Sequence, residues 1–238
     1  DLHLSLRRQR QMCIRDRLSN LSFSAELRVQ IVNCEAIEPL VAMLSSDNIE
    51  CRWPGSIALL NLAISNEWSQ RIVNAGAIPP VVAALASDDY RCKLYASMLI
   101  RELMEDDESG DIRLQAVNAG VCPALVGLLR TGDNNQTMAE AASALWSLSQ
   151  CDEVVKHMLF VDGLFYVLTG CLAKDALRIR ERCFRTLTNI HTKTQMSKCT
   201  HLIHGTLLVL RSLPGNTYVR DYLSLILLTD DMLSQAMC

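Results

Sequence analysis

Aromatic residues and chain breakers are scarce in this sequence. Phe, Trp and Tyr make up 5% of its 238 residues, and there are only 10 Gly and 6 Pro. So few breakers exclude a collagen-like or a low-complexity disordered chain. Half of the residues are hydrophobic, with Leu, Ala, Val, Ile and Met plentiful. Methyl-rich cores with few breakers are typical of all-helical proteins, so we expect an all-α fold.

An excess of charge of one sign is also missing. The formal net charge is −3, which gives no general positive field, and we expect no nucleic-acid partner. No segment has the length and apolarity of a membrane span either. The longest apolar candidate, residues 158–173, carries Asp162 and Gly163 in its middle. We therefore expect no membrane partner.

The 10 cysteines include no Cys-x-x-Cys pair, and the first residues show no continuous apolar run of a secretory signal. Cysteines in such a chain are expected to be reduced, half-buried small hydrophobic residues rather than disulfides. We therefore expect an intracellular protein, in the cytoplasm, with the nucleus as the alternative.

What the chain does have is an internal repeat. Residues 73–85, VNAGAIPPVVAAL, align with residues 117–129, VNAGVCPALVGLL. The pattern recurs twice more, and the four glycines lie 44, 43 and 42 residues apart: Gly76, Gly120, Gly163 and Gly205. Upstream, Glu35 occupies the glycine position, 41 residues before Gly76. A fixed period of this length indicates a repeat protein.

A second motif keeps the same period but lies out of phase with the first. It ends in the runs LSNLS, LLNLA, IRELM, LWSLS and LTNIH, whose central residues are Asn20, Asn61, Glu102, Ser147 and Asn189. We call these five the ladder positions. Two motifs that share one period along the chain predict about five copies of a single structural unit.

Each unit reads as three helices. A short helix ends at the glycine, which can adopt the left-handed conformation that closes a helix. A second helix follows, with Pro79 or Pro123 in its first turn, where the backbone N–H would be unpaired. A third, longer helix has apolar residues at three- and four-residue spacing. Because three short helices cannot bury their apolar faces alone, the units must stack on one another.

The period and the motifs resemble those of armadillo repeats. NAGAIPPVVAAL and NAGVCPALVGLL look like the family's second-helix signature, and ALLNLA looks like the end of its third helix. The resemblance covers residues 18–229 and implies a right-handed α-solenoid of about five three-helix repeats. We expect these repeats at residues 23–65, 66–107, 108–150, 151–192 and 193–229.

In this family the third helices line a concave groove, and an asparagine near the end of each holds the backbone of an extended peptide. An amide suits that task because it offers both a donor and an acceptor. The resemblance therefore implies a partner-binding groove lined by Ile57, Asn61, Tyr95, Met98, Glu102, Ser143, Ser147, Arg178, Arg182, Arg185 and Asn189. Importin-like members place a tryptophan four residues before the asparagine. Because this chain has Ile57, Met98, Ser143 and Arg185 there, an import-signal receptor is disfavoured.

The charge of the predicted groove changes along the chain. Arg178, Arg182, Arg185 and Asn189 follow the spacing i, i+4, i+7, i+11, so they share one helical stripe. The equivalent stripes of earlier repeats are neutral or mildly acidic. We therefore expect an acidic partner segment at the fourth repeat, although a stripe of this kind can also be a merely solvated helix face.

Both ends of the chain depart from the pattern. Residues 1–17 show no helical apolar stripe, and MCIRD is what ATGTGTATAAGAGAC encodes, which resembles a transposon adapter used in sequencing libraries. We expect these residues to be a non-native or disordered leader, with a genuine basic tail as the alternative. Residues 230–238 look like the start of a truncated further repeat. The chain is therefore expected to be a fragment.

Two clusters of potential metal ligands lack the residue spacing of a calcium or zinc site. Residues 105–111, EDDESGD, lack the closing glutamate of a calcium loop, so we expect a solvated acidic loop there. Cys199, His201 and His204 do not complete a zinc spacing, and we expect partly buried helix residues. No nucleophile elbow, phosphate loop or HExxH motif is present. We expect no metal, no cofactor and no enzymatic activity.

The sequence thus predicts a monomeric scaffold that binds a partner peptide or helix along its third-helix groove. Two alternatives remain open. The chain could be a structural module of a large cytoskeletal or ciliary assembly. It could also be the substrate-recognition part of a larger enzyme, such as a ubiquitin ligase. Function inferred from a repeat alone is an analogy.

Overall fold

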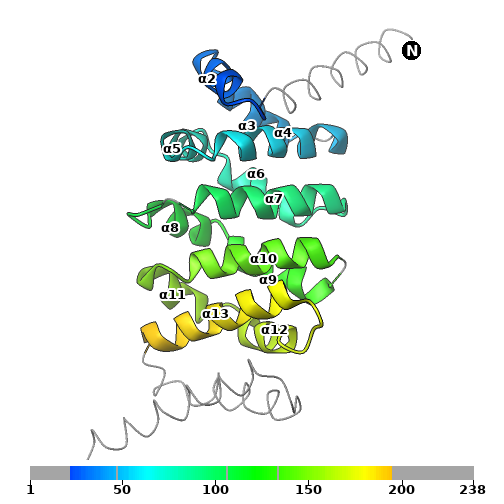
Figure 1. Ribbon diagram of the computed structural model, residues 1–238, viewed down its shortest axis with the longest axis vertical. Coiled ribbons are helices and arrows are strands. Elements are labelled where there is room, and N and C mark those ends of the chain that lie inside the picture. Colours follow the sequence, from blue (N-terminus) through cyan, green and yellow to red (C-terminus); the bar gives the residue numbers. More distant parts are fainter. Residues whose placement is uncertain (1–21, 47, 106, 133, 195–238) are drawn as a thin grey trace, which may run out of the picture. The chain divides into compact units, whose positions relative to one another are not determined.

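The computed structural model describes residues 22–46, 48–105, 107–132 and 134–194, and the ribbon is shown in Figure 1. Within these ranges the regular structure is helical, with no strand. Several predictions therefore lie outside the described residues: the leader, Asn20, the Cys199–His204 cluster, the Gly205 repeat and the truncated end. No single helix of the described part is long and apolar enough to cross a membrane, and α8 and α9 reach that limit only when taken together.

The chain divides into two compact units, residues 1–121 and residues 122–238. The first unit contains α2 (Ala25–Asn33), α3 (Ile37–Leu44), α4 (Ile49–Leu62), α5 (Asn66–Asn74), α6 (Ile78–Leu85), α7 (Tyr90–Leu103) and α8 (Asp111–Asn118). The second contains α9 (Val121–Thr131), which begins at the boundary, α10 (Asn135–Leu148), α11 (Asp152–Met158), α12 (Leu164–Cys171) and α13 (Leu177–Thr194). Short, short and long helices follow one another in each predicted repeat that the structure describes.

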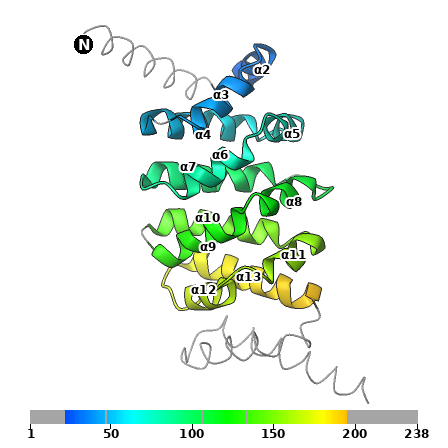
Figure 2. The same ribbon diagram turned by 180° about the vertical axis from the view of Figure 1, so that it is seen from behind.

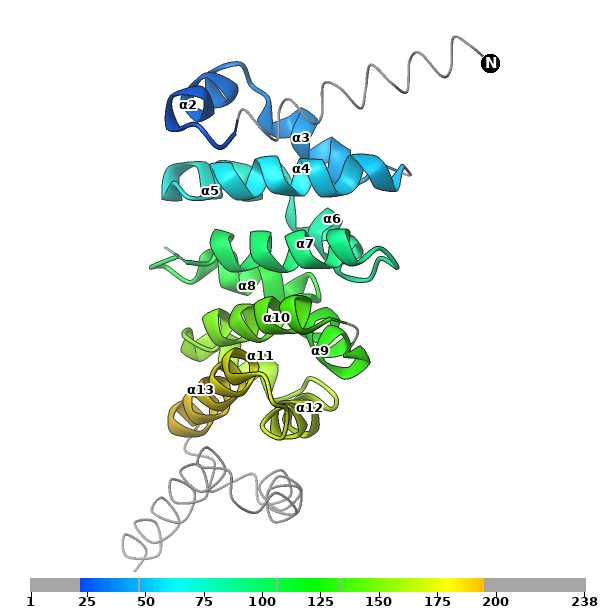
Figure 3. The ribbon, with the colours of Figure 1, turned by 45° about the vertical axis from the view of Figure 1, so that its right-hand side comes forward.

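In the first unit the long helices α4 and α7 pack side by side (Figure 3). The second helix of each repeat packs against its own long helix, α3 on α4 and α6 on α7, and α3 also contacts α6. The core side chains between these helices are almost entirely aliphatic. Among those fully removed from solvent are Leu59, Leu62, Leu99 and Ile100.

The second unit repeats this arrangement. Its long helices α10 and α13 pack together, while α11 and α12 both contact α13 (Figure 2). Leu145, Leu148, Leu168, Leu187 and Ile190 are fully buried. Because each long helix covers the apolar face of the next, the third helices are the elements that hold each unit together.

The long helices α4, α7 and α10 begin at polar caps that sequence reasoning did not identify. Asn48 precedes α4 and accepts a hydrogen bond from the N–H of Glu50, at 3.1 Å. Asp89 caps α7 and Asn134 caps α10 in the same way, each accepting from two backbone N–H groups. A side-chain cap of this kind satisfies N–H groups that have no partner within the helix, and it contributes about 1 kcal/mol.

The cysteines of the described residues are free thiols, as expected. Burial raises the pKa of the Cys122 thiol to about 12, so this group stays protonated at neutral pH. Four of the seven are buried and behave as small hydrophobic residues, namely Cys92, Cys122, Cys171 and Cys183.

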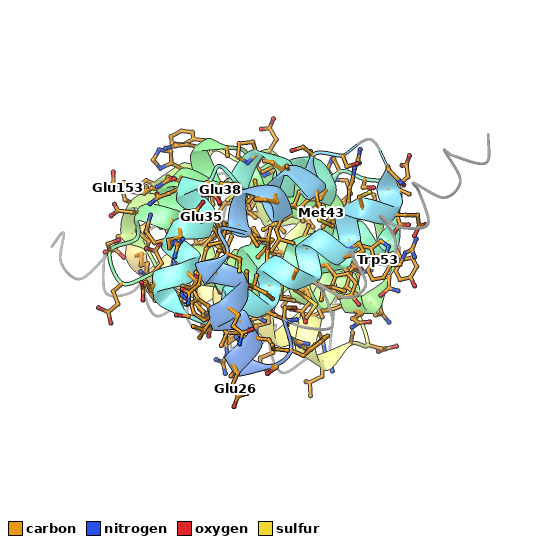
Figure 4. All side chains as sticks on the ribbon, turned by 90° about the horizontal axis from the view of Figure 1, so that it is seen from above. Glu26, Glu35, Glu38, Met43, Trp53 and Glu153 are labelled. Atoms are coloured by element: carbon orange, nitrogen blue, oxygen red, sulfur yellow. The ribbon has the colours of Figure 1, made fainter. Side chains whose placement is uncertain are left out.

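In the turn between α2 and α3, Glu35 takes the left-handed conformation that glycine has at the equivalent turns of the next two repeats. Its φ is +54°, the one positive φ of a non-glycine residue in the described part, and Gly76 and Gly120 have φ of +82° and +87°. The N–H of Glu35 bonds to the carbonyl of Val32, and that of Ala36 to the carbonyl of Ile31. These two bonds form a Schellman motif, which requires a left-handed residue. Glu35 lies at this corner beside Glu38 (Figure 4).

We predict that Glu35→Gly stabilises the protein. The left-handed conformation costs a non-glycine residue about 1–2 kcal/mol, and the greater freedom of glycine in the unfolded chain offsets part of the gain. The free energy of unfolding should therefore rise by about 1 kcal/mol in a urea titration. Ala36→Gly is the control: the φ of Ala36 is −82°, so glycine there only adds unfolded-state freedom and should lower stability. An unchanged or lower midpoint for Glu35→Gly would contradict this account of the turn.

The expectation of a solvated acidic loop at residues 105–111 is wrong for Asp107. Its side chain is only 3% exposed, and its carboxylate lies 3.5 Å from Arg113 Nη1. The carboxylate also accepts a hydrogen bond from the N–H of Arg113, at 2.9 Å. The guanidinium donates in addition to the carbonyls of Asp107 and Met104. Arg113 thus fixes the connection between α7 and α8 through a buried ion pair with Asp107, which lies six residues earlier in the sequence.

We predict that Arg113→Met is strongly destabilising. Removing one partner of a buried pair leaves an uncompensated charge, which costs about 3–5 kcal/mol. A thermal or urea unfolding curve measures the loss. Lys156→Met breaks an exposed pair with Glu153 and should leave the midpoint nearly unchanged. Adding Asp107→Asn to Arg113→Met should recover part of the loss, and additive losses would show that the two side chains are not coupled.

Candidate functional site

The predicted groove residues of the first unit lie on α4 and α7, the two long helices that pack together. Tyr95, Met98 and Glu102 are half-buried on α7, whereas Ile57 and Asn61 on α4 are buried. Of the predicted groove residues in this unit, those on α7 are therefore more accessible to a partner than those on α4.

Asn61 is committed to an internal contact. Its amide Nδ2 donates to the hydroxyl of Ser22 at 2.8 Å, and the residue is 9% exposed. Asn189 does the same in the second unit, where Nδ2 donates to the hydroxyl of Ser149 at 3.0 Å. Each serine lies two residues after the ladder position of the preceding repeat. A ladder asparagine thus links consecutive repeats, a role that the resemblance did not indicate.

The sequence could have revealed this pairing. It needs an asparagine at one ladder position and a serine two residues after the preceding ladder position. The serine then lies 39 or 40 residues before the asparagine. The corresponding serine positions before Glu102 and Ser147 hold Ala63 and Met104, neither of which has a hydroxyl to accept such a bond.

An aromatic cluster that sequence reasoning missed lies at the start of α4 and α7. Trp53 and Tyr95 stack with their ring centroids 6.3 Å apart and their planes 28° apart. The guanidinium of Arg91 lies over Trp53, 5.2 Å from the ring centroid. Trp53 is at the periphery of the view in Figure 4. Stacked aromatic side chains with an arginine on one face form a rigid, amphipathic surface.

Two carboxylates hold Arg91 in place. Its Nη2 lies 2.9 Å from Asp89 Oδ2 and 3.1 Å from Glu50 Oε1. The hydrogen bond from Arg91 holds the pKa of the Asp89 carboxyl below its usual value. Glu50 also accepts a weak hydrogen bond from the indole N–H of Trp53 at 3.5 Å. The charge of this arginine is thus neutralised within the protein.

The predicted arginine stripe of the second unit lies on α13, and two of its members are paired with acids. Arg178, whose side chain is 55% exposed, lies 2.9 Å from Glu140 on α10, whose side chain is 6% exposed. Arg185 lies 2.7 Å from Glu181, one turn earlier on the same helix. The stripe is therefore less basic than its sequence suggests, because two carboxylates offset two of the three arginines.

Arg182, the middle residue of the stripe, has a different neighbour. Its guanidinium lies over the indole of Trp146 on α10, 4.3 Å from the ring centroid, and Arg185 approaches the same ring at 5.9 Å. Trp146 was not predicted to belong to the groove. The predicted residues Ser143 and Ser147 on α10 are buried, and the Ser143 hydroxyl donates to the carbonyl of Ala139 within its own helix.

No family model and no curated protein sequence matches the chain. Three-dimensional comparison does find similar structures. One is a set of computationally designed armadillo repeat proteins for modular peptide recognition, with a TM-score of 0.76 and 21% identity over 90% of each chain. Another is a designed armadillo repeat protein in complex with the peptide (KR)4, with a TM-score of 0.72 and 20% identity over 90% of each chain.

A third similar structure, an engineered protein, has a TM-score of 0.74 and 25% identity over 87% of this chain and 85% of its own. Matches at this level of identity establish the fold. The predicted fold class, an α-solenoid of armadillo-type repeats, is confirmed.

Proposed function

Because the chain is an armadillo-type repeat protein by fold, we propose that it is a non-enzymatic scaffold. It binds an extended or helical peptide segment of another protein along its third-helix surfaces. The observation that carries this proposal is the set of half-buried aromatic and arginine side chains on α7, α10 and α13. Rigid aromatic rings and arginines are the residues that contribute most of the energy at protein interfaces.

The similar structures support a peptide as the partner. One is a protein designed for modular peptide recognition, and another holds a peptide of alternating lysine and arginine. Of the three stripe arginines on α13, Arg178 and Arg185 are paired with acids, and Arg182 has no such acid among the described residues. A basic peptide would meet like charges on α13, so the partner of this unit carries acidic residues.

Contacts with the side chains of the partner contribute more to binding here than contacts with its backbone. Asn61 already donates to Ser22 and Asn189 to Ser149, so each of these amides has one N–H bond fewer to offer a peptide. The aromatic and arginine side chains lie closer to solvent than Asn61 does. We therefore expect affinity to depend more on the residues of the partner than on its extended backbone.

The three tryptophans of the chain provide a test of the proposed surface. Trp53 and Trp146 lie on the third helices α4 and α10, whereas Trp68 lies on the first helix α5. We predict that a short acidic peptide changes the intrinsic fluorescence of the protein. Trp146→Phe should remove much of that response, and Trp68→Phe should leave it intact. Phe retains an aromatic ring in each position, so folding is preserved.

Pools of short acidic, basic and neutral peptides on a Gly/Ser background should be titrated against the unmodified protein and against the Trp146→Phe and Trp68→Phe variants. The acidic pool should bind at least about tenfold more tightly than the basic pool, since charge-assisted pairs contribute about 1.5–3 kcal/mol each. The proposal fails if no pool changes the fluorescence, or if only Trp68 responds. Preference for the basic pool would reject the acidic partner alone.

A further inference from the structure

In each unit an arginine lies over a tryptophan of the neighbouring third helix. Arg91 on α7 covers Trp53 on α4 in the first unit, and Arg182 on α13 covers Trp146 on α10 in the second. In both cases the flat guanidinium lies over the indole ring. Its N–H groups point outward in the plane of the fork, where they can reach an acceptor.

The first of these stacks shows what such a guanidinium binds. Arg91 Nη2 and Nε both lie within 3.3 Å of Asp89 oxygens, and Nη2 also donates to Glu50 at 3.1 Å. The stacked arginine therefore has carboxylate oxygens around its edge. Because both acids belong to the chain itself, this stack needs no outside partner.

The second stack differs in this respect. Among the described residues, no carboxylate lies within ion-pair distance of Arg182. Two acids of these helices, Glu140 on α10 and Glu181 on α13, are engaged elsewhere: Glu140 pairs with Arg178, and Glu181 pairs with Arg185. Arg182 is therefore available to an anionic acceptor from outside the described chain.

We propose that Arg182, held by Trp146, is a subsite for one anionic side chain of the bound peptide, a carboxylate or a phosphate monoester. This inference rests on the proposed scaffold function and specifies the chemistry of its partner at one position. The indole removes water from one face of the guanidinium, which strengthens a charge-assisted bond at its edge. The planar fork can bind two oxygens of the anion at once.

The test uses fluorescently labelled peptides that differ only at one central residue, which is Asp, phosphoserine, Asn or Lys. With the full chain, the Asp and phosphoserine peptides should bind at least about tenfold more tightly than the Asn peptide in an anisotropy titration. A similar affinity for both identifies a general anion subsite. A further tenfold preference for phosphoserine identifies a phosphopeptide partner, because a phosphate carries more charge and three acceptor oxygens.

Arg182→Gln should remove this discrimination and leave the binding of the Asn peptide nearly unchanged. Lys156→Gln is the matched control, since it removes the same charge from an exposed position on α11 of the same unit. It should keep the discrimination. Trp146→Leu removes the stacking surface and should reduce the preference for the anionic peptides, which gives a second variant should Arg182→Gln fold poorly.

Equal binding of the Asp, phosphoserine and Asn peptides to the unmodified chain would overturn the inference. So would an Arg182→Gln variant that keeps the preference, or a Lys156→Gln variant that loses as much of it. These outcomes leave peptide binding itself intact, so they are distinguishable from a failure of the scaffold function. If the scaffold function itself fails, none of the four peptides binds.

Discussion

The structure depends on one constraint: a three-helix unit of about forty residues cannot bury its own apolar face. Within each unit the two long helices therefore pack against each other, α4 against α7 and α10 against α13. This packing sets the spacing of every contact that joins two repeats. The serine that Asn61 bonds lies 39 residues earlier, and the serine that Asn189 bonds lies 40 residues earlier. Local turns and caps then need only place the next helix correctly.

The candidate binding surface follows from the same packing. A tryptophan on one long helix meets an arginine on the next because the helices lie side by side, as in Trp53 with Arg91 and Trp146 with Arg182. The two stacks have the same chemistry but differ in what surrounds them. Carboxylates of the chain neutralise the first, and the second has no such acid among the described residues. The distribution of acids, rather than the fold, thus distinguishes the two surfaces.

The helices could be predicted from the sequence because their signals are local and recur with the repeat. The glycine turn is an example: Glu35 occupies the glycine position, and its φ is positive like those of Gly76 and Gly120. The burial of Asp107 could not be predicted, because it depends on one unrepeated partner, Arg113. The same holds for Trp146 and Glu140, whose roles depend on residues of α13 about forty positions away. The Trp–Arg contact occurs in both units, but Trp53 lies eight residues before Asn61 and Trp146 lies directly before Ser147, so a repeat alignment does not superpose the two.

The central claim is that the third-helix surface, and in particular the Trp146–Arg182 stack, binds an acidic peptide. The most direct measurement is paramagnetic broadening of the three indole N–H signals by an acidic peptide that carries a nitroxide label. The account predicts that the Trp146 signal broadens strongly, while the Trp68 signal on α5 does not. Broadening of Trp68 with Trp146 unaffected, at a peptide concentration that saturates the protein, would contradict it.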